Sequence, residues 1–187
     1  MKVANIKQNL DKIKERISNA DFLSNKGLAN EVGIHVFCYD PADELIVREY
    51  IDRFIETPSD DYRIIVRNLY KIFLEILEDE DVIDAIPNLE DDEGKESLLE
   101  TLHNIASPEA FLAKMKYEPV KYGDVLFLTG VGEVFPFMRA HVMLETMQEA
   151  FAKIPIVMFY PGSFNGQDLH LFNRFFDDHH YRAFNLL

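Results

Sequence analysis

Hydrophobic residues recur at helical spacing at the start of the chain and in short continuous runs after it. The first set has spacings of four, three and four residues, which places it on one side of an α-helix: Ile6, Leu10, Ile13 and Ile17. We therefore predict an N-terminal helix over residues 5–20, with this apolar side packed against a core.

Apolar runs of strand length follow, each bounded by glycine, proline or polar residues. The clearest are Ile34–Tyr39, which stops at Asp40-Pro41, and Asp124–Thr129, which stops at Gly130. Proline fixes φ and disfavours helix in the residue before it, so Asp40-Pro41 ends a strand and begins a helix. Further strands are predicted at Arg63–Arg67, at Ile154–Tyr160 and within Tyr181–Leu186.

Helical segments separate these runs. Alternation of strands with helices indicates an α/β fold with a mainly parallel sheet, and right-handed crossovers place helices on both faces. We predict a single three-layer α/β domain over residues 1–187. Its sheet is expected to be P-loop-like or Rossmann-like, with about five strands but no phosphate-binding loop. A helical acidic insertion is expected at about residues 75–118.

The composition is that of a folded globular protein. Hydrophobic residues make up 48% of the 187 residues, which is enough to bury one sizeable core. No apolar run approaches the roughly 18 residues that span a bilayer, and Met1–Lys7 lacks the apolar region of a signal peptide. The single cysteine, Cys38, allows no internal disulfide, so we expect a cytoplasmic, reducing setting.

Negative charge is concentrated in one segment. Between Glu75 and Glu100, twelve acidic residues stand against Lys95 alone, a net charge of −11 out of the chain's −14. This is the wrong sign for stand-alone nucleic-acid binding, which needs a cationic surface. The plainer interpretation of the segment is a solvated helix–loop–helix edge, and the alternative is a docking surface for a basic partner. The candidate docking residues are Glu78, Asp79, Glu80, Asp91, Asp92 and Glu93.

No nucleotide-binding loop is recognisable. The phosphate loop needs GxxxxGK[ST], whereas the turn after the first strand, Tyr39–Glu44, has no glycine or lysine and carries three carboxylates. Gly130–Phe135 matches half of the dinucleotide motif GxGxxG and follows a late strand instead of the first. A glycine turn before a helix could hold an anion, but Glu133 within this one opposes it. We interpret it as a tight turn that needs glycine, and we predict no cofactor.

Residues at the strand ends form a candidate crevice, because parallel sheets place ligand or partner surfaces there. Arg139 and His141 lie just after the glycine turn, and Pro161-Gly162 is interpreted as a turn that closes the fourth strand. A histidine in such a place can be a general base, but on a helix rich in methionine and leucine it is more often a packed residue. No Gly-x-Ser-x-Gly nucleophile motif accompanies it, so we predict no catalytic residue. The crevice residues are Asp40, Thr129, Gly130, Gly132, Phe135, Arg139, His141, Tyr160 and Gly162.

Two further groups of residues carry weaker signals. Asp177–His180 holds four potential metal ligands, but adjacent side chains on an extended segment point to opposite faces, and zinc sites favour spaced ligands. We therefore predict a polar turn and no metal. Several phenylalanines lie near loops and helix starts, where some could form an exposed interaction patch, although Phe is more often buried: Phe135, Phe137, Phe164, Phe172, Phe175 and Phe176.

Motifs along the whole chain resemble one known family. The most specific are Leu128–His141 (LTGVGEVFPFMRAH) and Phe159–Gly162 (FYPG). Phe37–Pro41 (FCYDP) and Tyr181–Phe184 (YRAF) extend the likeness toward both ends. On these residues the chain resembles the BrxB family of bacteriophage exclusion (BREX) defence systems.

The resemblance implies a role but no catalytic residues. Members of this family are encoded among defence genes beside a methyltransferase, a large ATPase and PglZ, which resembles alkaline phosphatases. The implied role is a non-catalytic component that binds other BREX proteins, with PglZ the expected partner. A homodimer is also compatible with the sequence. The alternative is a ligand-binding or hydrolytic α/β domain that uses the crevice at the strand ends.

Overall fold

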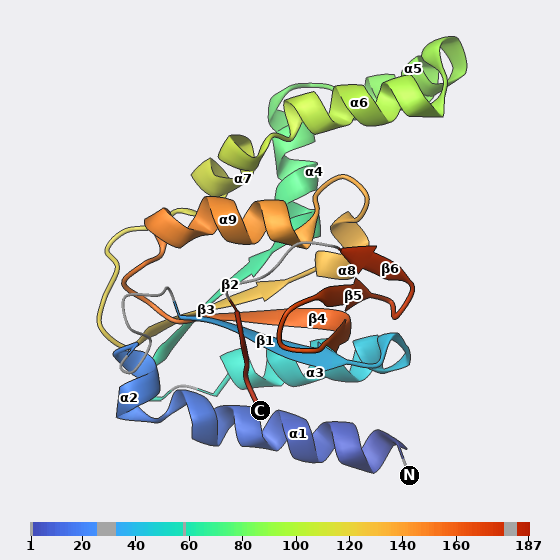
Figure 1. Ribbon diagram of the computed structural model, residues 1–187. Coiled ribbons are helices and arrows are strands. Elements are labelled where there is room, and N and C mark those ends of the chain that lie inside the picture. The colour runs from blue at the N-terminus through green and yellow to red at the C-terminus, as the bar shows by residue number, and fades with distance from the viewer. Residues whose placement is uncertain (1, 26–32, 58, 178–182) are drawn as a thin grey trace.

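The computed structural model describes residues 2–25, 33–57, 59–177 and 183–187. Among them, five parallel strands form the central sheet in the order β2-β3-β4-β1-β7, and helices cover both of its faces (Figure 1). This confirms the predicted α/β class with a mainly parallel sheet. The strands are β1 (Ile34–Tyr39), β2 (Arg63–Asn68), β3 (Asp124–Thr129), β4 (Ile156–Phe164) and β7 (Phe184–Asn185).

Alternate residues of the inner strands enter two separate cores, one on each face of the sheet. On β3, Leu126 and Leu128 pack into one core, whereas Val125 and Phe127 pack into the other. All four side chains have an exposed fraction of 0%. A strand buried on both faces has apolar residues at every position, which is why β1 and β3 are recognisable in the sequence with the bounds predicted.

Three helices cover one face of the sheet, the lower one in Figure 1: α1 (Lys2–Ile17), α2 (Ala20–Leu23) and α3 (Glu44–Ile55). The N-terminal helix was predicted over residues 5–20, but α1 ends at Ile17. The Asn19 side chain accepts a hydrogen bond from the Asp21 N–H at 2.8 Å and begins α2. The predicted apolar side of α1 is buried, with Ile13 and Ile17 both fully enclosed. A short 3₁₀ turn, η1 (Pro41–Asp43), leads from β1 into α3.

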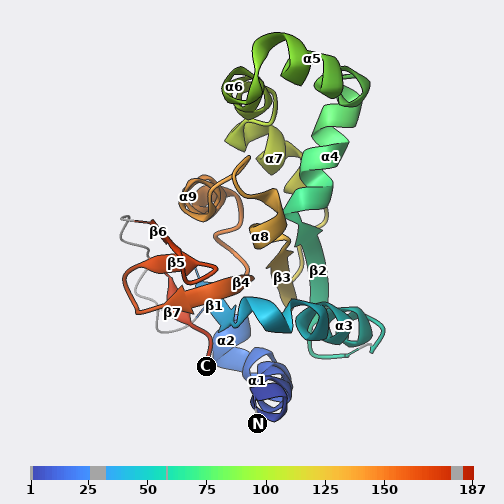
Figure 2. The same cartoon turned by 90° about the vertical axis from the view of Figure 1, so that its right-hand side faces the viewer.

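The other face carries the remaining helices: α4 (Leu69–Asp79), η2 (Ile83–Ala85), α5 (Ile86–Glu93), α6 (Lys95–Ile105), α7 (Pro108–Met115), α8 (Val131–Val134) and α9 (Ala140–Ala150). α5 and α6 pack on each other and extend away from the sheet (Figures 1 and 2). No residue of α5 is buried. We call the end of α4 together with α5 and α6 the acidic arm, residues 78–105.

The predicted turn at Pro161-Gly162 is wrong, because β4 continues through it. Pro161 lies opposite Tyr39 in parallel register, and Gly162 lies opposite Leu171 in antiparallel register. Proline has no N–H to donate, but its carbonyl accepts the Phe172 N–H at 2.8 Å. β4 therefore passes from the central sheet into a small antiparallel extension formed by β5 (Leu169–Leu171) and β6 (Phe175–Asp177).

The last predicted strand is found as β7, parallel to β1. The potential metal ligands Asp178, His179 and His180 lie outside the described residues. Within the described part of the chain, no helix is long and apolar enough to span a membrane.

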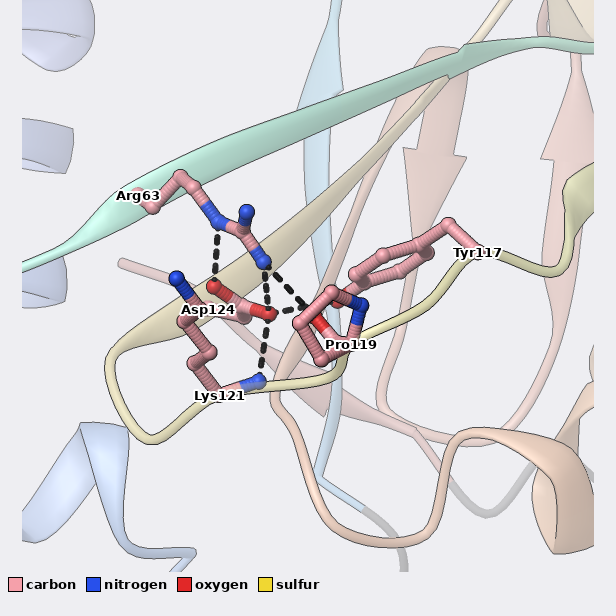
Figure 3. A network of polar contacts seen from close by, with 5 residues as sticks. All are labelled: Arg63, Tyr117, Pro119, Lys121 and Asp124. Atoms are coloured by element: carbon pink, nitrogen blue, oxygen red, sulfur yellow. Dashed lines mark hydrogen bonds and ion pairs between the residues drawn. The ribbon is translucent and has the colours of Figure 1, made fainter.

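An ion pair between half-exposed Arg63 and the buried carboxylate of Asp124 holds the amino ends of β2 and β3 together, on the edge opposite the candidate crevice (Figure 3). The Asp124 carboxylate is 1% exposed and accepts from both Nε and Nη2 of Arg63 at 2.7 Å. It also accepts from the Tyr117 hydroxyl at 3.0 Å and the Lys121 N–H at 2.8 Å. The segment that returns from α7 to β3 is thereby fastened to the sheet.

Candidate functional site

Two hollows occur at the carboxyl edge of the sheet, and they share no lining residue. The first lies beside α3 and the ends of β1, β2 and β3, and we call it the α3 cleft. The second lies beside α8, α9 and the β5–β6 extension, and we call it the aromatic pocket. The single crevice predicted from the sequence is therefore divided.

The α3 cleft has a volume of about 290 Å³ and contains two of the predicted crevice residues, Thr129 and Gly130. Its lining mixes apolar side chains with polar ones of both charges. The polar and charged side chains are those of Tyr39, Glu44, Arg48, Asp52, Asn68, Lys71 and Thr129. Among the described residues that line the cleft there is no serine or cysteine to act as a nucleophile and no histidine to act as its base.

A chain of ion pairs fills the place where a phosphate loop would hold an anion. Arg48 contacts Glu44 at 2.7 Å and Glu133 of α8 at 2.9 Å, so it joins α3 to the glycine turn. Glu44 also accepts the Tyr39 hydroxyl at 2.6 Å. Burial and this hydrogen bond raise the pKa of Tyr39 well above its usual range, which keeps the hydroxyl protonated as a donor. The cation at this turn is thus already neutralised by the protein's own carboxylates.

Gly130 is required by the geometry of its turn. Its φ of +72° is in the left-handed region, and a Cβ there would lie 2.5 Å from Oδ1 of Asn68. That same oxygen accepts the Lys71 N–H at 3.0 Å and caps α4. The glycine therefore permits close approach of the β3 turn to the start of α4, as expected for a tight turn.

The aromatic pocket has a volume of about 240 Å³ and contains Phe135, Arg139 and Tyr160 from the predicted set. Tyr160 is 2% exposed and forms part of the inner wall. The ring of Phe135 lies 4.9 Å from that of Phe175. The complete lining is Val131, Phe135, Met138, Arg139, Ala140, Tyr160, Leu171, Arg174, Phe175 and Phe176.

Two glycines let the β5–β6 extension close over the strand ends. A Cβ on Gly132 of α8 would lie 2.9 Å from both the Phe172 ring and the Pro161 ring. A Cβ on Gly162 would overlap the carbonyl oxygen of His170. Gly132 and Gly162, two of the three predicted crevice glycines, are thus packing positions, where the protein's own chain lies against the sheet edge.

The remaining predicted crevice residues lie apart. Asp40 accepts the Ala42 N–H at 3.0 Å and caps η1. His141 is half-buried in the first turn of α9 and lines neither hollow. Within the described residues, no three His, Cys, Asp or Glu side chains lie close enough to hold a metal ion.

The six candidate docking residues are exposed but form two groups. Glu78, Asp79 and Glu80 are at the end of α4, and Asp91–Glu93 are at the far end of α5 (Figure 1). Asp79 pairs with Lys114, and Glu93 accepts the Ser97 hydroxyl. The side chains of the other four make no hydrogen bond or ion pair with the described part of the chain: Glu78, Glu80, Asp91 and Asp92.

Sequence reasoning missed two features of the site. Arg48 was not among the predicted crevice residues, because its pairing with Glu133 depends on how α3 packs beside α8. Arg174 lies between polar and aromatic residues in a segment with no regular pattern, and only the β5–β6 pairing brings it to the aromatic pocket.

Comparisons with known proteins agree with the motifs. The family described as BREX protein BrxB matches residues 65–186. A BREX protein BrxB of Bacillus cereus (strain H3081.97) is 37% identical over 187 residues, covering 97% of each chain. Another from Escherichia coli O9:H4 (strain HS) is 29% identical over 181 residues, covering 95% of this chain and 90% of that protein. No solved structure gives a significant match. The chain belongs to the BrxB family of BREX proteins.

Proposed function

We propose that this chain is a non-catalytic adaptor in BREX phage defence, which binds other BREX proteins and most directly the phosphatase-like PglZ. The observation that carries the proposal is the occupied carboxyl edge of the sheet. Where an α/β protein usually binds its ligand, Glu133 and Glu44 already neutralise Arg48, and the β5–β6 extension lies against the strand ends. Family membership supports the defence role.

The proposal extends to the chain's surroundings. The adaptor acts in the cytoplasm, without a cofactor or metal and without binding nucleic acid by itself. A net charge of −14 disfavours contact with phosphate backbones and favours contact with basic protein surfaces.

The acidic arm is the proposed docking surface for a basic partner. Its unpaired carboxylates are exposed on helices that extend from the sheet, so a partner can reach them without disturbing the core. Charge reversal in Glu78→Lys/Glu80→Lys and in Asp91→Lys/Asp92→Lys is expected to reduce partner recovery at least about tenfold at low salt. The measurement is a pull-down of the tagged chain from cells that express its neighbouring defence genes, with mass and stoichiometry of the eluted complex.

A matched control places the same charge change elsewhere. Glu15→Lys/Glu56→Lys alters two exposed carboxylates on the opposite face of the sheet and is expected to retain the partner. If both arm variants hold the partner as well as the wild type, the arm is a solvated edge and not the interface.

The second candidate function is ligand binding in the α3 cleft, favoured by Lys71, Asn68 and Thr129 in its lining. A thermal-shift screen distinguishes ligand binding in this cleft from the non-catalytic adaptor function. A ligand at 100 times its Kd adds about 2.7 kcal/mol of stability. We expect no shift with ATP, GTP, NAD, phosphate, Mg²⁺ or Zn²⁺. A shift that Lys71→Ala abolishes would favour the ligand-binding function instead.

A further inference from the structure

The aromatic pocket presents two arginines whose side chains have no partner among the described residues. The Arg139 and Arg174 side chains are exposed, and neither forms a hydrogen bond or ion pair with any described residue. The other arginine beside the strand ends, Arg48, is bound by two carboxylates. In a chain with 33 acidic side chains and a net charge of −14, two arginines at one hollow that pair with no described residue are positioned to receive an external anion.

The same pocket has an apolar wall that is partly exposed. Phe175 is 48% and Phe176 58% exposed, although most large apolar side chains of the described chain are buried. Phe135 and Tyr160 extend this surface inward. Exposed phenylalanines beside a concave, partly apolar wall are typical of a surface that another molecule covers.

The pocket suits a side chain of a protein better than a free small molecule. Its volume of about 240 Å³ is below the roughly 300–1,000 Å³ of most small-molecule sites. Phe176 in its wall is 58% exposed, and a ligand confined to this volume would leave part of that ring uncovered. Among the described residues β6 pairs only with β5, so its outer edge is available for hydrogen bonds from an extended peptide.

We propose that the aromatic pocket binds an extended segment of a protein partner in which a carboxylate lies within a few residues of a large apolar side chain. The apolar side chain packs against Phe135 and Phe175, whose rings are already in contact, and the carboxylate pairs with Arg139 and Arg174. The N-terminus of α9 lies in the pocket wall and lacks a side-chain cap. The positive end of its helix dipole therefore also favours the carboxylate of the bound segment. The inference rests on the proposed adaptor function and adds a second, cationic contact to it.

The experiment is selection from a random peptide display library with the folded chain as bait. Library peptides that bind an Arg139→Glu/Arg174→Glu variant are first removed, before the selection on the wild-type chain. We expect enrichment of peptides that hold Asp or Glu near Phe, Leu or Tyr. For a selected peptide, fluorescence polarisation should show at least about tenfold weaker binding to Arg174→Ala. Arg53→Ala, which removes an exposed arginine from α3, should bind as the wild type does.

Other outcomes overturn the inference. Selection of no peptide, or of peptides without acidic residues, contradicts it. So does tight binding of phenyl phosphate or benzoate, as probes of a small aromatic anion, when no peptide is selected. Because the altered arginines are exposed, the variants should have the same melting temperature as the wild type. A matching melting temperature excludes misfolding as the cause of weaker peptide binding.

The pull-down separates this inference from the adaptor function. If Arg139→Glu/Arg174→Glu still recovers the BREX partner as the wild type does, the pocket is not part of that interface and the adaptor function stands. If the wild-type chain recovers no partner while acidic peptides bind the pocket, the adaptor function fails and the peptide site remains.

Discussion

Replacing Asp124 with alanine is expected to lower the free energy of unfolding by about 3 kcal/mol. The carboxylate is 1% exposed and accepts four hydrogen bonds, two of them from Arg63. Its loss leaves the Lys121 N–H and the Tyr117 hydroxyl without this acceptor. Arg63 is 45% exposed and can be hydrated instead, so the expected loss is at the low end for a broken buried pair.

Urea denaturation followed by far-UV circular dichroism measures this loss, since the chain has no tryptophan. Asp124→Asn, which keeps an acceptor but no charge, should fall between alanine and wild type. Asp60→Ala removes an exposed carboxylate from the loop before β2 and should change stability by less than about 0.5 kcal/mol. A similarly small change for Asp124→Ala would show that the cluster is dispensable.

The contribution of Asp124 also has a defined pH range. Burial raises the pKa of the carboxyl, but hydrogen bonds from Arg63, the Lys121 N–H and Tyr117 outweigh it and hold that pKa below its usual value. The stabilisation is therefore complete above the ordinary aspartate pKa of about 3.9 and is lost as pH falls through the lowered folded value. The difference between wild type and Asp124→Ala should shrink below about pH 4.

Local pattern predicted the bounds of β1 and β3 because these inner strands are buried on both faces. Ile34–Tyr39 and Asp124–Thr129 are apolar at nearly every position, and both form strands with those bounds. The extension formed by β5 and β6 has three residues in each strand and no alternation strong enough to identify. Its pairing to β4 depends on Gly162 accepting close contact with His170, which is a long-range fact that no local pattern carries.

In the candidate site, too, local sequence pattern predicted some features, whereas others depend on long-range contacts. General knowledge of parallel sheets placed Thr129, Gly130 and Tyr160 at one edge, and all three lie there. The sequence did not predict that Gly132 packs against Phe172 and Pro161, so one expected crevice becomes two hollows. Charge counting located the acidic arm but not its division into two groups, since that depends on the path of α5.

Acid is expected to destabilise the protein through His35, in a pH range above that of Asp124. His35 is 4% exposed on β1, and its ring lies 4.7 Å from that of Phe22 and 5.9 Å from that of Phe184. Within the described residues its Nδ1 has no hydrogen-bond partner. Burial, with a smaller contribution from Arg16, lowers the pKa of this imidazole to about 4.

The unfolded chain binds the proton that the folded chain excludes, because an exposed histidine has a pKa of about 6.5. The contribution of neutral His35 to the free energy of unfolding is therefore fully present above a pH of about 6.5 and is lost as pH decreases toward 4. The expected loss is about 2 kcal/mol between pH 7.5 and pH 5, and about 3 kcal/mol by pH 4. Urea denaturation at each pH measures it.

A variant with no ionisable group at this position isolates the contribution of His35. His35→Phe keeps an aromatic ring between Phe22 and Phe184 and should lose most of the pH dependence over this range. His103→Gln, which alters an exposed histidine of α6, should keep it. If wild type and His35→Phe lose stability in parallel from pH 7.5 to pH 5, the buried imidazole is not the cause. The contact of β1 with α2 and β7 would then be insensitive to protonation.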